Sequence, residues 1–145
     1  MILRDLAPTI LDHVGIDQDP VEMDGRSFAS IAEGRSPEPR ALHWHFPAYL
    51  EGGGAAGLWR TTPVSSIRDG RWKLMEFFED GRLELYDLEQ DQGEETDLSA
   101  QHVDVVQRLH SDLRAWRSTV GAGMPTPIES PTEPSPPNPP SGGDA

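Results

Sequence analysis

The stretch SSIRDGRWKLMEFFEDGRLELYDL, residues 65–88, contains three short apolar runs separated by two Asp-Gly pairs. Asp69-Gly70 and Asp80-Gly81 accept the positive φ angles that a tight hairpin turn requires. The runs beside these turns are rich in aromatic and other apolar residues, which are typical of strands. The stretch therefore predicts a three-stranded antiparallel meander with strands at residues 65–68, 71–78 and 82–88.

A long helix is predicted after the meander. Apolar residues recur there every three or four positions, and polar residues lie largely off that stripe. The stripe consists of Val103, Val106, Leu109, Leu113, Trp116 and Val120, and Gly121 ends it. Burying each such side chain contributes about 1.5 to 3 kcal/mol, so packing fixes the helix. Arg114 and Arg117 are expected on its exposed face.

Further elements are predicted before the meander. ALHWHF, residues 41–46, alternates and is rich in aromatic residues, which indicates a fourth strand. The glycine-rich residues 49–63 indicate a mobile loop. Towards the N-terminus, Asp5 as N-cap and helical apolar spacing predict a short helix at residues 6–14, and a second is predicted at 28–33.

These elements predict an α+β fold. An antiparallel sheet of about four strands is packed by the long C-terminal helix, with short helices at the N-terminus. The middle strand of the meander carries apolar side chains on both sides, so both faces of the sheet are expected to be partly covered. Residues 124–145 carry eight of the 14 prolines and almost no apolar residues, which predicts a disordered tail.

Composition excludes several functions. A formal net charge of -13 disfavours binding to nucleic acid, because phosphate contacts need clustered Lys and Arg. No apolar run reaches the roughly 18 residues of a membrane span, and the N-terminus lacks the pattern of a signal peptide. The chain has no cysteine, which excludes disulfides, thiolate metal sites and a cysteine nucleophile within it.

Five segments together resemble the C-terminal part of the type I sulfatases, the arylsulfatase-like family of the alkaline phosphatase superfamily. The most specific of them is IRDGRWKL followed by ELYDLEQDQGEETDL, a hairpin with an acidic turn that leads into the closing helix. The other segments are DLAPTILDHVGI, MDGRSFASIAEG, HWHFPAYL and VVQRLHSDLRAWRSTVGAGMPTPI. The resemblance extends from about Asp5 to Ile128.

This resemblance implies a larger enzyme. In the family, an N-terminal α/β domain holds a divalent metal, usually calcium, and a formylglycine made from cysteine or serine that attacks a sulfate ester. The C-terminal subdomain closes one edge of the substrate cleft. The substrate expected for the whole enzyme is a sulfated carbohydrate or an aryl sulfate, and its expected location is periplasmic or extracellular.

The chain departs from the whole enzyme because no segment matches the nucleophile motif. SPEPR, residues 36–40, lacks the proline two positions after Ser36 that the serine form requires. We expect a C-terminal fragment with no catalytic, metal-binding or cofactor-binding residue, inactive without its missing N-terminal sulfatase domain. Residues 1–35 correspond to the end of the catalytic domain, residues 36–123 to the C-terminal subdomain and residues 124–145 to the tail.

The resemblance also nominates three substrate-binding residues, His45, Tyr49 and Trp59, since this strand and the loop after it approach the cleft in the family. His43 and His45 share a strand face and form a conceivable metal pair, although no third ligand stands at suitable spacing. A structural role explains the two histidines better.

Other charged residues have ordinary interpretations. The acidic residues at 69, 80 and 87–95 suggest general acid–base pairs or a calcium loop, but turn chemistry explains them better, and no EF-hand pattern fits. Arg68 and Lys73 flank the hairpin and are candidates for contacting a sulfate, while pairing with nearby carboxylates or exposure to solvent is the simpler interpretation.

An alternative function is a free-standing protein-interaction or carbohydrate-binding module. Trp44, Tyr49 and Trp59 would then be aromatic platforms, and the proline-rich tail would be a partner ligand. Exposure of apolar residues separates the two hypotheses. A detached subdomain exposes the surface that faces its parent, including the helix of Ile10 and Leu11, whereas an independent module covers it.

Overall fold

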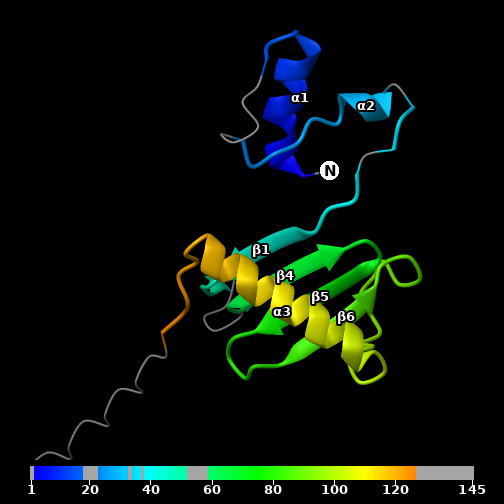
Figure 1. The fold of residues 1–145 in the computed structure, drawn as a ribbon. Helices are drawn as coiled ribbons and strands as arrows, with labels where there is room; N and C mark the ends of the chain where they lie inside the picture. Colours follow the sequence, from blue (N-terminus) through cyan, green and yellow to red (C-terminus); the bar gives the residue numbers. More distant parts are fainter. Residues whose placement is uncertain (1, 18–22, 33, 37, 52–58, 127–145) are drawn as a thin grey trace, which may run out of the picture.

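The computed structural model describes residues 2–17, 23–32, 34–36, 38–51 and 59–126. Its main layer is a four-stranded antiparallel sheet with the strand order β1-β4-β5-β6 (Figure 1). The strands are β1 (Leu42–Phe46), β4 (Val64–Asp69), β5 (Trp72–Phe77) and β6 (Leu83–Asp87). The predicted α+β class, meander and fourth strand are therefore confirmed.

The two Asp-Gly turns set the register of the meander. Gly70 and Gly81 have φ angles of 59° and 71°, in the left-handed region that glycine adopts without a steric cost. Ile67 consequently lies opposite Leu74, and Leu74 lies opposite Leu85, so one apolar row crosses three strands. The long C-terminal helix packs against this apolar row.

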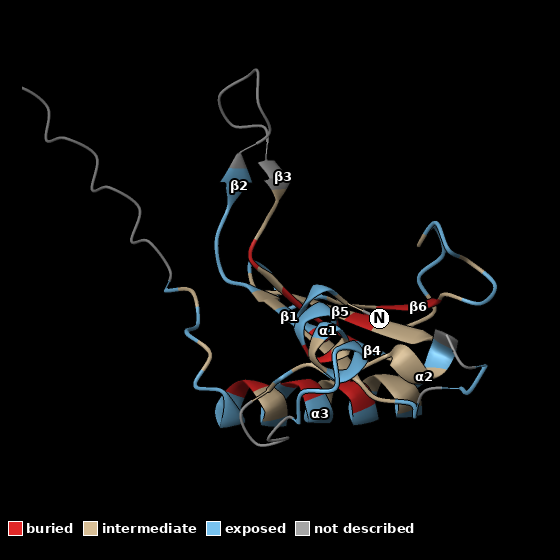
Figure 2. Cartoon of the chain, turned by 90° about the horizontal axis from the view of Figure 1, so that it is seen from above, coloured by how far each residue is buried: buried red, intermediate tan, exposed pale blue. Residues whose placement is uncertain are grey.

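Helix α3 (Val103–Thr119) covers one face of the sheet (Figure 2). Leu109 and Leu113 are fully buried against the apolar row. Val106 and Trp116 pack at the margin of this core, whereas Val103 and Val120, at the two ends of the predicted stripe, are each 53% exposed. The centre of the predicted stripe forms the core, and its ends extend past the sheet.

The prediction that Arg117 lies on the exposed face of the helix is wrong. Arg117 is buried, and its Nη1 lies 2.6 Å from Oε2 of Glu76 on β5. His110 Nε2 lies 3.2 Å from the other carboxylate oxygen of Glu76. Burial raises the pKa of Glu76, but its bonds to Arg117 and His110 hold that pKa below its usual value. Arg114 is exposed as predicted.

The opposite face of the sheet has no covering helix among the residues that the structure describes. Trp44 and Phe46 of β1 point to that side and are 43% and 39% exposed. Ser66 and Tyr86, which alternate with the α3-facing Ile67 and Leu85, are nevertheless buried on that side, so both faces are partly covered as expected.

The predicted N-terminal helices are present as α1 (Leu6–His13), preceded by a 3₁₀ turn at Leu3–Asp5, and as the four-residue α2 (Ala29–Ala32). They lie on the β1 side of the sheet (Figure 1). Gly15 follows α1 with a φ of 72°, the left-handed conformation that commonly ends a helix.

Residues 49–63 differ from the predicted mobile loop at both ends. Leu50–Glu51 (β2) pairs with Trp59–Thr61 (β3) in a two-stranded arm that projects on the side opposite α3 (Figure 2). Pairing of Phe46 with Val64 brings the two ends of the segment together, which reduces the entropy lost when β2 and β3 pair. The glycine-rich centre, residues 52–58, lies outside the described residues.

The predicted disordered tail lies mostly outside the described residues, because the structure describes it only at 124–126, without helix or strand. Within the described part of the chain, no helix combines the length and apolar character needed to cross a membrane.

The core assignment predicts a strong position dependence of stability. Leu113→Ala should lower the free energy of unfolding by about 2 to 5 kcal/mol, because it leaves a cavity under the sheet. Val103→Ala removes an aliphatic side chain from an exposed site on the same helix and should change that free energy by less than about 0.5 kcal/mol. Urea unfolding followed by tryptophan fluorescence measures both, and equal losses would contradict this core.

Candidate functional site

The side chain of His45 is held at both ring nitrogens. Its Nδ1 lies 2.6 Å from Ser65 Oγ on β4, and its Nε2 lies 2.7 Å from the carbonyl oxygen of Gly123, after α3. A carbonyl oxygen only accepts hydrogen bonds, so Nε2 carries a hydrogen and Nδ1 of the neutral ring accepts from Ser65. Ser65 is buried, which keeps its hydroxyl away from a substrate.

Tyr49 stands at the start of the β2–β3 arm. Its hydroxyl donates a hydrogen bond of 2.8 Å to Glu79 Oε1, in the turn between β5 and β6. This hydrogen bond to a carboxylate raises the pKa of Tyr49 above its usual value. Trp59 begins β3, whose backbone pairs with that of Glu51. The structure describes the Trp59 backbone but not its side chain.

The three nominated residues therefore belong to one end of the sheet, where β1 ends and the arm departs. His45 faces α3, since it lies opposite Ser65 in the register. The His45 ring meets the Phe78 ring edge-on with 5.7 Å between centroids, whereas Tyr49 bonds to the next residue, Glu79. The end of the sheet presents an exposed tyrosine beside a carboxylate, an arrangement that suits binding better than nucleophilic catalysis.

His43 and His45 share a strand face, but each has its own partner. The His43 ring stacks on Trp116 with 4.8 Å between ring centroids. Burial holds the pKa of His43 below its usual value. Among the described residues, no group of three or more His, Asp or Glu side chains is arranged to hold a metal ion.

The acidic segment after β6 organises its own backbone. Asp91 accepts hydrogen bonds from the amides of Glu95 and Thr96, at 2.8 Å each. Asp97 accepts from the amides of Leu85 and Ser99, at 3.0 and 2.8 Å. These contacts support turn chemistry over an acid–base pair.

Two neighbouring basic residues form ion pairs with carboxylates of this acidic segment and of β6. Arg71 forms an ion pair with the buried Asp87. Lys73 Nζ lies 2.6 Å from Glu94 Oε2, as the interpretation of a pair with a nearby carboxylate predicts. Arg68 instead is exposed and donates from Nε to the Gly70 carbonyl at 3.4 Å.

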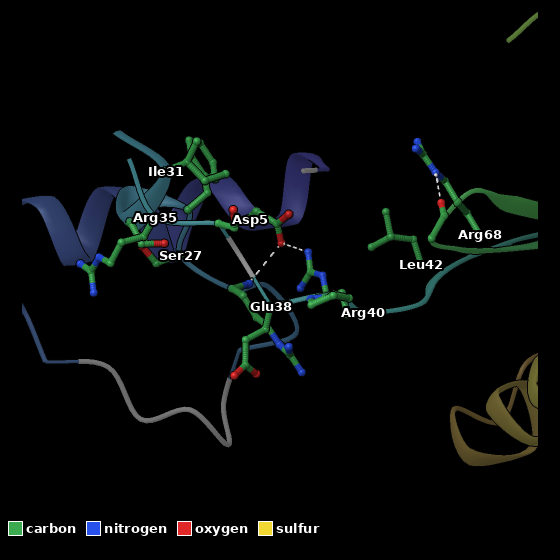
Figure 3. A pocket seen from close by; sticks show the side chains of 14 residues that line it. Asp5, Ser27, Ile31, Arg35, Glu38, Arg40, Leu42 and Arg68 are labelled. Carbon is green, nitrogen blue, oxygen red and sulfur yellow. Dashed lines mark hydrogen bonds and ion pairs between the residues drawn. The ribbon is translucent and has the colours of Figure 1, made fainter. Parts of the chain in front are cut away.

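A cavity of about 540 Å³ lies between residues 26–40 and the edge of the sheet. On the sheet side it reaches Leu42 and the turn between β4 and β5. Figure 3 shows Arg40 beside Asp5, while Arg68 lies at the far end near Leu42. The cavity is lined by four arginines, Arg26, Arg35, Arg40 and Arg68.

Asp5 is the buried centre of this region, with only 2% of its surface exposed. Its carboxylate accepts hydrogen bonds from the amides of Ile2 and Arg26, at 2.9 and 3.1 Å, and pairs with the guanidinium of Arg40. Burial raises the pKa of Asp5, but these partners outweigh burial and lower it to about 2.

Sequence reasoning assigned Asp5 only as a helix N-cap. The residue stands at that position, but its side chain makes no capping bond to α1. The partners Arg26 and Arg40 lie 21 and 35 residues away, and no local pattern links them. The cavity was missed for the same reason.

The polar face of α1 is turned towards its own chain. Thr9 Oγ1 accepts from the Phe28 amide at 3.0 Å, and Asp12 accepts from the Ser27 hydroxyl at 2.6 Å. Gly25 allows this close approach, because a Cβ there would overlap the carbonyl group of Arg4. The opposite face carries Leu3, Leu6, Ile10 and Val14, all exposed, which we call the α1 stripe.

Comparisons with known proteins identify a family for this chain. The family described as "N-sulphoglucosamine sulphohydrolase, C-terminal" matches residues 1–119. A sulfatase of Formosa agariphila is 35% identical over 108 residues, which are 66% of this chain and 18% of that protein. The chain thus spans about a fifth of the length of this relative.

Solved structures show the same fold. A 2-O GAG sulfatase superposes with a TM-score of 0.59 at 25% identity, over 81% of this chain and 25% of that one. A protein solved with its substrate D-glucosamine-2-N,6-O-disulfate superposes with a TM-score of 0.61 at 21% identity, over 83% of this chain and 24% of that one.

The depressed pKa of Asp5 predicts a specific pH dependence. The folded-state pKa of about 2 lies below the usual aspartate pKa of 3.8, so the carboxylate contributes stability that is fully present above pH 3.8. This contribution is lost as the pH falls through about 2. The ¹³C chemical shift of the Asp5 carboxyl, followed by NMR, should titrate with a midpoint near 2. A midpoint at or above the unfolded value would contradict the buried pairing.

Gly25→Ala should separate residues 23–28 from α1, because the added Cβ meets the backbone of Arg4. We expect hydrogen exchange at the amides of Arg26 and Phe28 to accelerate more than about tenfold. Gly123→Ala is the matched control, since a Cβ there has no atom within 4 Å. Unchanged protection of both amides in the Gly25 variant would show that the close approach is unimportant.

Proposed function

Since the chain belongs to the sulfatase family described as N-sulphoglucosamine sulphohydrolase, C-terminal, we propose that it is a non-catalytic docking domain of a larger sulfatase. In this proposal it packs on an N-terminal catalytic domain, closes one edge of the substrate cleft and has no activity alone. The substrate of the whole enzyme is a sulfated carbohydrate or an aryl sulfate.

The α1 stripe is the observation that carries this proposal. In a helix that packs only on its own domain, the apolar face is turned inward and the polar face meets water. Here Leu3 is 86% exposed and Ile10 is 53% exposed, while Asp5 and Thr9 bond inward. A contiguous exposed apolar surface of this kind marks an interaction site, and it disfavours a self-sufficient module.

The same helix supports the proposed division of the chain. Hydrogen bonds tie Asp5 and Thr9 to residues 26–28 within the first unit, and the ion pair of Arg40 with Asp5 joins that unit to the segment that leads into β1. Residues 1–35 then form the end of the catalytic domain, residues 36–123 form the C-terminal subdomain, and residues 124–145 form a tail beyond it.

The β2–β3 arm is the proposed edge of the cleft. Tyr49 and Trp59 would contact the leaving group there, because the arm projects beyond the sheet (Figure 2). His45 belongs to the same proposal, although contact with substrate requires one ring nitrogen to leave Ser65 or Gly123. Such contacts would lower the barrier by fixing substrate geometry.

Calcium and formylglycine do not fit the residues of this chain. Formylglycine arises from cysteine or serine in a nucleophile motif, whereas the chain has no cysteine and SPEPR lacks the required proline. The carboxylates of the acidic segment accept backbone hydrogen bonds, and the described residues form no cluster able to hold a metal. In this proposal both groups belong to the N-terminal domain.

A chimera tests the proposed function. This chain would replace the matching segment of the Formosa agariphila sulfatase, and hydrolysis of 4-nitrophenyl sulfate would be measured beside the unaltered enzyme. We expect turnover by the chimera and none by the 145-residue chain alone. Turnover by the isolated chain would refute its non-catalytic role, and an insoluble or inactive chimera would refute its role as a docking domain.

Charged substitutions test the surface involved. Leu6→Asp with Ile10→Asp places carboxylates in the proposed interface, where an unpaired charge costs several kcal/mol, so turnover by the chimera should fall more than about tenfold. Val103→Asp is the matched control, because Val103 and Ile10 are both 53% exposed. Full activity of the double variant would exclude the α1 stripe as the docking surface.

A further inference from the structure

The cavity between residues 26–40 and the edge of the sheet, which we call the arginine groove, differs from the rest of the molecule in charge. Four of the 12 basic residues line it, against the carboxylates of Asp5 and Glu38. The whole chain carries a formal charge of -13. A local excess of guanidinium groups within an acidic chain favours an anionic ligand.

The groove is built from segments that are distant in sequence. Asp5 holds the backbone of Arg26 and the guanidinium of Arg40, so these two residues are fixed relative to each other. Arg68 comes from the sheet and is oriented by its bond to the Gly70 carbonyl. Because the arginines stand at opposite ends (Figure 3), the groove suits an extended ligand with charge at more than one point.

The remaining lining matches a sugar. Ser30 and Ser36 provide hydroxyls that both donate and accept hydrogen bonds. Phe28, Ile31 and Leu42 provide apolar walls against which the faces of a sugar ring can pack. Guanidinium groups bind the oxygens of sulfate and carboxylate through paired N–H donors. A volume of about 540 Å³ lies within the range of small-molecule sites.

We infer that the arginine groove binds an anionic sugar residue, one that carries sulfate or carboxylate groups. This inference rests on the proposed function, because the bound residue would be a second saccharide unit of the sulfated glycan on which the whole enzyme acts. The groove then selects chains of charged sugars.

NMR titration of the 145-residue chain tests this inference. The probe is D-glucosamine-2-N,6-O-disulfate, with unsulfated D-glucosamine and inorganic sulfate as the comparison ligands. We expect the disulfated sugar to shift the amide signals of the groove and to bind at least tenfold more tightly than either comparison ligand. No binding, or equal binding of inorganic sulfate, would overturn the inference.

Variants locate the site. Arg26→Ala and Arg68→Ala remove exposed guanidinium groups at different parts of the groove, and each should weaken binding about tenfold through the loss of charge-assisted hydrogen bonds. Arg114→Ala removes an exposed arginine from α3 and should leave affinity unchanged. Circular dichroism checks that each variant folds. Equal affinity of all three variants would place the sugar outside the groove.

The two proposals fail in different ways. An active chimera combined with no sugar binding by the chain would overturn the groove and leave the docking function intact. Sugar binding in the groove combined with an inactive chimera would overturn the docking function.

Discussion

The arrangement of the N-terminal half depends on the buried carboxylate of Asp5. A carboxylate without partners is expensive to bury, and here two backbone amides and one guanidinium compensate for the loss of water. The contacts fix which side of α1 faces the chain. Because the polar side is used internally, the apolar side faces outward, and one ionic centre thereby produces both the exposed stripe and the arginine groove.

The C-terminal half depends on a different constraint, the burial of a single apolar row under α3. Ile67, Leu74 and Leu85 come from adjacent strands and meet Leu109 and Leu113 of the helix. This small core leaves the opposite face of the sheet without a helix among the described residues. The small core holds the strands and α3 together. The α1 stripe, the β2–β3 arm and the arginine groove lie outside that core and face outward.

Local patterns in the sequence predicted most of the fold. The Asp-Gly turns fixed the meander, and the three- to four-residue spacing of apolar residues located α3. The errors concern features that depend on distant residues. Arg117 follows the buried Leu113 by about one helical turn and is buried because its charge is compensated by Glu76 on β5. The pairing of β2 with β3 depends on the β1–β4 contact that brings the segment ends together.

The candidate site was less predictable than the fold. His45 was placed on the correct strand. Its hydrogen-bond partners Ser65 and Gly123 are 20 and 78 residues away, so no local sequence pattern could predict these bonds. The arginines of the groove are scattered at positions 26, 35, 40 and 68 without periodicity. The proposed docking function comes from the family resemblance. The structure shows the surfaces that this proposal uses.

The central claim is that the outward face of α1 is an interface with a sulfatase catalytic domain. Carbene footprinting of the isolated chain and of the chimera with the Formosa agariphila enzyme measures this directly, because the label reacts with exposed side chains. The account predicts that labelling of Leu3, Leu6, Ile10 and Val14 falls several-fold in the chimera, while that of Val103 on α3 stays the same. Equal labelling of the α1 stripe in both molecules would contradict it.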